Sequence, residues 1–222
     1  MRFMGFVLGM CCFLCVVTTP ARAMILLNEF LADPPAGSAG DANGDGVRST
    51  TQDEFVEIYN SGLTGIDISG WYLKDADATR HVFANSLILS PQEVYVVFGG
   101  GNPTLSGFRW AKASTGSLSL NNDKDTISLF NSSNVLMDQI IYGDEANKDQ
   151  SLTRSPEGEN GLLVLHMNLP NANGRRFSPG YLVNPPVFNN TVVPEPTSLM
   201  TLAGGVFAGL LTRKKKSRRA AF

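Results

Sequence analysis

Hard oxygen ligands recur at alternate positions in the stretch GDANGDGVRSTTQDEF, which covers residues 40–55. Asp41, Asn43 and Asp45 occupy the first, third and fifth positions of a calcium-binding loop, and Gly46 occupies the sixth, where such a loop turns sharply. This spacing suits calcium because alternate residues of a tight loop point their oxygens at one centre. The carbonyl of Val47 would add another ligand. The stretch is therefore a candidate calcium site.

The same stretch departs from the calcium pattern at position 12, which should supply a bidentate carboxylate but is Gln52. Asp53 or Glu54 would have to replace it, one or two residues late. The alternative is a surface turn without metal, because Asp, Asn and Gly favour turns on their own. Bound calcium would have a structural role, holding a long loop at extracellular concentrations. The candidate ligands are Asp41, Asn43, Asp45, Val47, Asp53 and Glu54.

Residues that could catalyse a reaction are few. His81 and His166 both fall in β-rich runs, and neither has an acidic residue at a spacing that would indicate a catalytic pair. The sequence contains no nucleophile elbow, paired-histidine zinc motif or phosphate-binding glycine loop. Acidic residues near turn signals could form a glycosidase pair, or they could simply be acidic turn tips; these are Asp123, Asp125, Asp144 and Glu145. We therefore predict no catalytic residue.

The elements that must position these residues are short strands. Runs with β-strand composition, separated by Gly, Asn, Asp and Pro clusters, fall at residues 25–31, 54–60, 65–73, 80–83, 93–98, 126–130, 137–142, 151–154 and 162–166. A parallel sheet would need crossover helices, and no helical periodicity is visible between residues 24 and 193. The pattern predicts an all-β fold, an antiparallel sandwich or barrel.

Two stretches resemble the lamin-tail domain: ILLNEFLADPP at residues 25–35 and DEFVEIYNSGLTGIDISGWYLKD at residues 53–75. RHVFA, VYVVFGGG and the closing FSPGYL extend the resemblance over most of residues 24–182. It implies an immunoglobulin-like β-sandwich, which in bacteria occurs on secreted and surface proteins, alone or beside nucleases and phosphatases. Many bacterial members look similar in the insert at residues 40–55.

Trp71 lies in the most specific part of this resemblance, directly after Gly70. A residue without a side chain before the ring lets the chain pack closely as it turns inward. We expect Trp71 in the core, since large aromatic residues are usually buried. A surface platform for a sugar is the alternative.

The N-terminus has the three-part layout of a secretory signal peptide. Arg2 precedes an apolar run over residues 3–17, and Ala21 and Ala23 stand at the two positions that signal peptidase reads. An uncleaved membrane anchor is the alternative, although the run is short of the roughly 20 residues that a span needs. All three cysteines lie at or before Cys15, so cleavage after Ala23 leaves a mature chain without disulfides.

The C-terminus combines a Pro194-Glu195-Pro196 triplet, a short apolar run and a basic end. The run over residues 199–211 would reach about 20 Å as a helix, less than the roughly 30 Å hydrocarbon core of a bilayer. These three parts resemble the PEP-CTERM sorting signals of bacterial surface proteins. The resemblance implies transient membrane association through residues 197–212 and recognition by an exosortase, a membrane transpeptidase. The basic residues that follow the run include Arg213, Lys214, Lys215 and Lys216.

Charge limits the classes of partner. Residues 24–193 contain 10 Lys and Arg and 19 Asp and Glu, a net charge of −9, while the whole chain carries −2. A body this acidic repels phosphate backbones, so we expect no nucleic-acid binding.

The sequence thus predicts four parts: a signal peptide (1–23), a lamin-tail-like sandwich (24–183), a Pro- and Asn-rich linker (184–193) and a sorting signal (194–219). We expect a non-catalytic module, secreted to the bacterial cell surface or extracellular matrix, that binds a glycan or protein ligand. Signal peptidase and an exosortase would process it. The alternatives are a small secreted hydrolase that uses loop carboxylates and an accessory targeting module for a separate enzyme.

Overall fold

The computed structural model of the protein describes residues 25–185. The predicted signal peptide, the sorting signal and its expected short membrane helix lie outside these residues, as do Ala21, Ala23 and the Pro194-Glu195-Pro196 triplet. A membrane-spanning helix, long and apolar enough to cross a bilayer, does not occur within residues 25–185.

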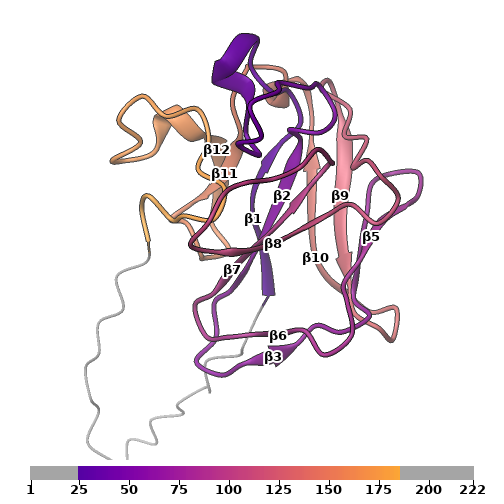
Figure 1. Cartoon of the computed structure of the whole chain (residues 1–222). Coiled ribbons are helices and arrows are strands. Elements are labelled where there is room, and N and C mark those ends of the chain that lie inside the picture. Colours follow the sequence, from indigo (N-terminus) through magenta and orange to yellow (C-terminus); the bar gives the residue numbers. More distant parts are fainter. Residues whose placement is uncertain (1–24, 186–222) are drawn as a thin grey trace, which may run out of the picture. The chain divides into compact units, whose positions relative to one another are not determined.

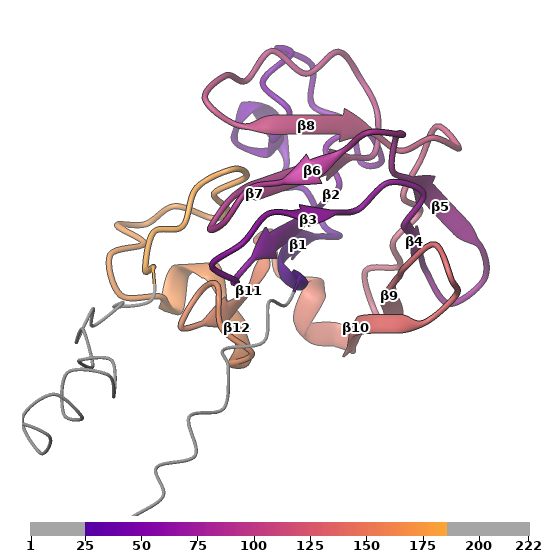
Figure 2. The same ribbon diagram turned by 90° about the horizontal axis from the view of Figure 1, so that it is seen from below.

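Two main sheets make up the fold (Figure 1). One has six strands in the order β12-β11-β1-β2-β7-β8, and the other has four in the order β10-β9-β4-β5. Strands β3 and β6 pair at one end of these sheets (Figure 2). The strands are β1 (Ile25–Leu31), β2 (Phe55–Asn60), β3 (Ile66–Asp67), β4 (Tyr72–Lys74), β5 (Thr79–Val82), β6 (Ile88–Leu89), β7 (Val94–Phe98), β8 (Arg109–Lys112), β9 (Asp125–Phe130), β10 (Leu136–Tyr142), β11 (Leu152–Ser155) and β12 (Leu162–Leu165). Short 3-10 helices are η1 (Gly37–Gly40), η2 (Asp144–Ala146) and η3 (His166–Asn168). This architecture confirms the predicted immunoglobulin-like β-sandwich.

The main core lies between the two larger sheets. Phe30 of β1 contacts Tyr142 of β10, with ring centroids 4.6 Å apart. Ile58 of β2 and Leu129 of β9 are fully buried in the same cluster. Trp71 is 8% exposed and belongs to this cluster too, which confirms its predicted place in the core and argues against a surface platform.

A bulge in β1 sets which side chains face this core. The pairing with β2 shifts register between Leu27 and Glu29, so Asn28 is the extra residue. In a regular strand, Leu27 and Phe30 would face opposite sides, because side chains alternate. After the bulge both pack in the core between the sheets. Asn28 and Glu29 therefore turn to the other face of the larger sheet.

That outer face is buried as well. Leu31 of β1, Phe55 of β2 and Phe98 of β7 are fully buried in a second apolar cluster. Leu105 and Phe177, which come from connections rather than strands, pack against it. As a result, every residue of β1 and β2 is buried, on both faces.

The predicted strand over residues 65–73 is wrong in its middle. The structure has β3 and β4 instead, separated by a turn in which Trp71 N–H donates to the Ile68 carbonyl at 3.1 Å. Gly70 has a φ of +69°, a conformation that favours glycine. An added Cβ would meet only Ser132 Cβ at 3.6 Å, which is ordinary contact. The glycine is needed for the turn, not for close packing as the sequence suggested.

Strands β6 and β8 were not predicted, and β8 departs from the antiparallel pairing of the predicted sandwich. It runs parallel to β7, with Tyr95 opposite Arg109. The connection, residues 99–108, is shorter than the dozen residues that parallel crossovers usually need, and it contains no helix. Strand β8 lies at the sheet edge and has β7 as its one neighbour in the sheet. The chain therefore reaches its parallel position without a covering helix.

Replacing Trp71 with alanine should destabilise the domain by about 3–5 kcal/mol, because the change leaves a cavity between the sheets. The matched control is Trp110→Ala on β8, where the ring is only half-buried and the loss should be smaller. Urea unfolding followed by circular dichroism measures both. An unfolding midpoint unchanged by Trp71→Ala would contradict the core assignment.

Candidate functional site

The loop at residues 41–47 is organised by its own carboxylates and amide. Asp41 accepts hydrogen bonds from the N–H groups of Asp45, at 3.1 Å, and Gly46, at 2.9 Å. Asn43 Oδ1 accepts from Asp45 N–H at 3.0 Å, and Asp45 Oδ1 accepts from Val47 N–H at 2.9 Å. The structure thus brings Asp41, Asn43 and Asp45 together around one turn.

Asp53 binds the backbone of this loop and of the residues that follow it. Its two oxygens accept hydrogen bonds from Asn43 N–H at 3.1 Å and Ser49 N–H at 2.6 Å. Burial raises the pKa of Asp53 above its ordinary value, against the lowering effect of these hydrogen bonds. Gly101 borders the loop so closely that an added Cβ would lie 2.5 Å from Asn43 Nδ2 and from Asp45 Oδ2. Asp53 therefore shapes the loop, with both oxygens engaged by backbone groups.

The remaining candidate ligands lie differently. Val47 is exposed, and its side chain is 64% accessible. Glu54 is buried and points away, with Oε2 accepting from Leu120 N–H at 3.4 Å. Burial raises the pKa of Glu54 to about 8. Over residues 25–185 we find no three His, Cys, Asp or Glu side chains grouped to hold a metal ion. Calcium binding at this loop stays a prediction.

A second group of carboxyls lies on the outer face of β1 and β2, and the sequence analysis missed it. Glu29 and Glu57 stand directly opposite each other across the two strands, and both are fully buried. Like charges directly opposite in a sheet repel, and burial disfavours the ionised form. Burial raises the pKa of Glu29 to about 7, and burial with the nearby Glu29 raises the pKa of Glu57 well above its ordinary value.

The bulge residue Asn28 and a third glutamate complete this group. Asn28 Nδ2 donates to Glu57 Oε1 at 2.8 Å, and its Oδ1 accepts from Gly158 N–H at 2.7 Å. Glu157 is fully buried, and burial raises its pKa to about 7. Its Oε2 accepts from Asn184 N–H at 2.5 Å. We call Glu29, Glu57 and Glu157 the glutamate cluster.

Both histidines are buried. His81 is 4% exposed, and neither ring nitrogen has a hydrogen-bond partner. Its ring packs edge-on against Phe83, and burial lowers its pKa to about 4. His166 is fully buried, and its nitrogens contact the Arg175 carbonyl and Ser178 Oγ, both at 2.9 Å. Both histidines are therefore shielded from solvent.

The carboxylates considered for a glycosidase pair bind nearby backbone or amide groups. Asp125 accepts from the N–H groups of Ala76 and Asn121, both at 3.0 Å. Glu145 accepts from Gly143 N–H, and Asp123 accepts from Asn147 Nδ2 at 3.0 Å. Asp144 lies in η2. These contacts fit acidic turn residues, the alternative left open by the sequence.

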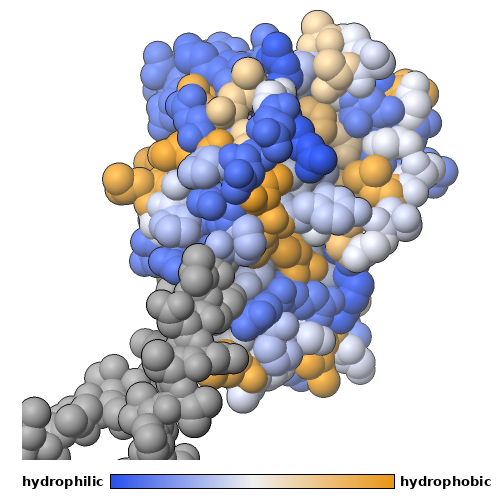
Figure 3. Space-filling view, turned by 90° about the vertical axis from the view of Figure 1, so that its left-hand side faces the viewer, coloured by the Kyte–Doolittle hydropathy of each residue, from blue (hydrophilic) through white to orange (hydrophobic). Residues whose placement is uncertain are grey.

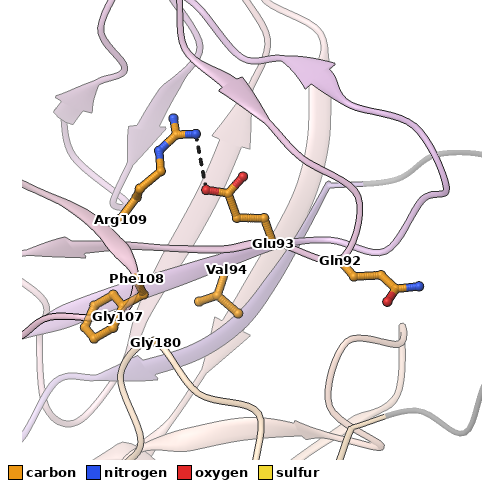
Figure 4. A pocket seen from close by; sticks show the side chains of 7 residues that line it. All are labelled: Gln92, Glu93, Val94, Gly107, Phe108, Arg109 and Gly180. Atoms are coloured by element: carbon orange, nitrogen blue, oxygen red, sulfur yellow. Dashed lines mark ion pairs between the residues drawn. The ribbon is translucent and has the colours of Figure 1, made fainter.

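An open groove of about 540 Å³ lies between β7, β8 and the C-terminal segment (Figure 4). Glu93 and Arg109 form an ion pair of 3.2 Å across it. Arg109 also donates to the Ile88 carbonyl at 2.8 Å and lies 5.7 Å from the centre of the Tyr95 ring. Figure 4 shows Val94 between this pair and Gly180. The charged groups of the groove already bind each other.

Comparisons with known proteins find two families that match separate parts of the chain. The PEP-CTERM protein-sorting motif matches residues 192–216, which include Pro194, Glu195, Pro196 and the basic residues 213–216. This match indicates an exported protein that is processed at the membrane, and it implies recognition by an exosortase. A comparison with curated proteins found no match.

The Lamin Tail Domain family matches residues 18–144, more than half of the chain. This span includes strands β1 to β10, the loop at residues 41–47 and two members of the glutamate cluster. The families found at the two ends are structural and sorting modules. The chain belongs to the lamin tail domain family.

Proposed function

We propose that this lamin tail domain is a non-catalytic structural or binding module, displayed on the bacterial surface or in the extracellular matrix after exosortase processing. The observation that carries the proposal is the sorting motif at residues 192–216, which follows a folded sandwich in the same chain. A sorting signal places the domain outside the cytoplasm, and the domain then acts through its surface.

The polar groups of the domain support a non-catalytic role. His166 and the glutamate cluster are buried, and their contacts hold parts of the fold together. A catalytic acid or base must reach substrate at hydrogen-bond distance, which buried groups of this kind do not do. The acidic turn residues, which a hydrolase would use, serve backbone groups instead.

The surface suits a polar or neutral ligand rather than a polyanion. On the face shown in Figure 3, hydrophilic side chains border a short strip of apolar ones. The net charge of −9 over residues 24–193 disfavours nucleic acids. An extracellular glycan or protein fits these features, and the groove between Glu93 and Gly180 is a cavity among the described residues that could take part of one.

Processing at the sorting motif can be tested by intact mass. Protein extracted from the cell surface should have a mass that corresponds to residues 24 to about 194–196. The double change Pro194→Ala with Glu195→Ala should leave the basic tail in place, because it removes the motif. Pro186→Ala, just upstream, is the matched control and should be processed normally. A wild-type surface protein that keeps residues 213–216 would refute the proposal.

Calcium binding can be tested by thermal unfolding. We expect millimolar calcium to raise the melting temperature, because the ion would hold the loop through Asp41, Asn43 and Asp45. The double change Asp41→Ala with Asp45→Ala should abolish the rise, whereas Asp77→Ala, an exposed acid elsewhere, should leave it unchanged. A melting temperature insensitive to calcium in the wild type would leave only the metal-free turn.

A further inference from the structure

The glutamate cluster holds the last described segment of the chain. Glu29 Oε1 accepts from Ser178 N–H at 2.9 Å, and Glu57 Oε2 accepts from Gly180 N–H at 2.8 Å. Glu157 accepts from Asn184 N–H. Each member of the glutamate cluster therefore accepts a hydrogen bond from the backbone of residues 177–184, which we call the strap. The strap is the segment that leads toward the sorting motif.

A row of three side chains joins the strap to the sheet: His166, Ser178 and Glu29. The distance from His166 Nε2 to Ser178 Oγ is 2.9 Å, and the distance from Ser178 Oγ to Glu29 Oε2 is also 2.9 Å. His166 Nδ1 lies 2.9 Å from the Arg175 carbonyl, which can only accept. Nδ1 must therefore carry a proton.

The hydrogen bonds of this row require one hydrogen more than the Ser178 hydroxyl supplies. The two gaps, from Nε2 to Oγ and from Oγ to Oε2, each need one hydrogen, and the Ser178 hydroxyl has only one. The second must be on Glu29 Oε2 or on His166 Nε2. Without it, one gap would bring two lone pairs together. A buried acceptor that faces no donor hydrogen is unfavourable.

We propose that the strap is a proton-dependent latch: one buried proton shared by Glu29, Ser178 and His166 keeps residues 177–184 on the sheet, and the strap detaches when that proton is lost as pH rises.

The charges around Glu29 reinforce this direction. The charges of Glu29 and Glu157 raise the pKa of Glu57 on β2, and the charge of Glu29 raises the pKa of Glu157 after β11. On β11, the charged Arg154 pairs with Asp138 at 2.8 Å and donates to the Leu27 carbonyl. Arg154 alternates with Thr153, which lies opposite Glu29, so Arg154 and its partner Asp138 belong to the other face of the sheet. The charged groups near the row are Glu57, opposite Glu29 on β2, Glu157, which raises the pKa of His166, and Arg175, which lowers it.

The docked strap holds a proton that a solvent-exposed glutamate would release, since Glu29 has a pKa of about 7 against an ordinary 4.5. Docking is thus favoured at low pH and weakens as pH rises through 7. Release would add eight residues, up to about 26 Å when extended, to the link before the sorting motif. That effect on display rests on the proposed function, whereas the latch itself does not.

Hydrogen exchange of the full chain in mild detergent tests the latch. Exchange is followed by mass spectrometry at pH 5.5 and 8.5 and corrected for intrinsic rates. Protection of the strap should fall at least tenfold at pH 8.5, while the peptide covering β7 keeps its protection. Strap protection independent of pH would overturn the proposal, as would a parallel loss in β7, which would mean global unfolding.

Glu29→Gln is the decisive variant. Its Nε2 would donate to Ser178 Oγ, as the protonated acid does, while Oε1 would still accept from Ser151 Oγ and Ser178 N–H. The fall in strap protection between pH 5.5 and 8.5 should then be less than half that of the wild type on a logarithmic scale, because only Glu57 and Glu157 still lose protons. Glu159→Gln, at an exposed position, should behave as wild type. A wild-type pH response in Glu29→Gln would refute the latch.

Ser178→Ala keeps the test independent of how well Glu29→Gln folds. Removing the hydroxyl separates Glu29 from His166, so no single proton bridges them. The pH at which strap protection falls should then move upward, because the lost hydroxyl lowers the pKa of Glu29 in the wild type. An unchanged response in a folded Ser178→Ala protein would contradict the proposal, whether or not the sorting motif is processed.

Discussion

Burial of both faces of β1 and β2 is the constraint on which the rest of the structure depends. A sheet with one wet face could leave Glu29 and Glu57 in water, where opposed charges are screened. Here connections and the strap cover that face, so the two carboxyls lie opposite each other without solvent. Buried carboxyls must be protonated or bound by donors. The strap supplies those donors from its backbone.

The bulge at Asn28 connects this arrangement to the core. It lets Leu27 and Phe30 both pack between the sheets while Asn28 and Glu29 turn outward together. Beyond the short β1–β11 pairing, the backbone groups of Leu27 bind side chains instead: its N–H donates to Asp138 at 2.8 Å, and its carbonyl accepts from Arg154 at 2.7 Å. One irregular residue thus serves the apolar core and the polar cluster at once.

These features explain what the sequence could and could not predict. The strand at residues 25–31 was predicted with its observed bounds, because its apolar content and the following turn signal are local. The turn around Asp41, Asn43 and Asp45 was visible for the same reason, since three of its hydrogen bonds join residues at most five apart. Local order of this kind is encoded in adjacent residue types.

Features that depend on distant segments were missed. In FVEIYN, Glu57 alternates with apolar residues and so has the pattern of a solvent-facing position, because nothing local reveals that residues 177–184 cover it. Strand β8 forms only through its pairing with β7. One clue was present in the sequence. The closing FSPGYL must find hydrogen-bond partners for its backbone when it packs, and Asn28-Glu29 in the opening strand offers polar side chains.

Burial holds the pKa of both opposed glutamates, Glu29 and Glu57, above the ordinary value. The most direct measurement is a carbon-13 NMR titration of the side-chain carboxyls, with Glu29 assigned by the signal lost in Glu29→Gln. We expect the Glu29 signal to titrate at about pH 7 and the Glu57 signal higher than its ordinary value of 4.5. Midpoints near 4.5 for both residues would contradict the account.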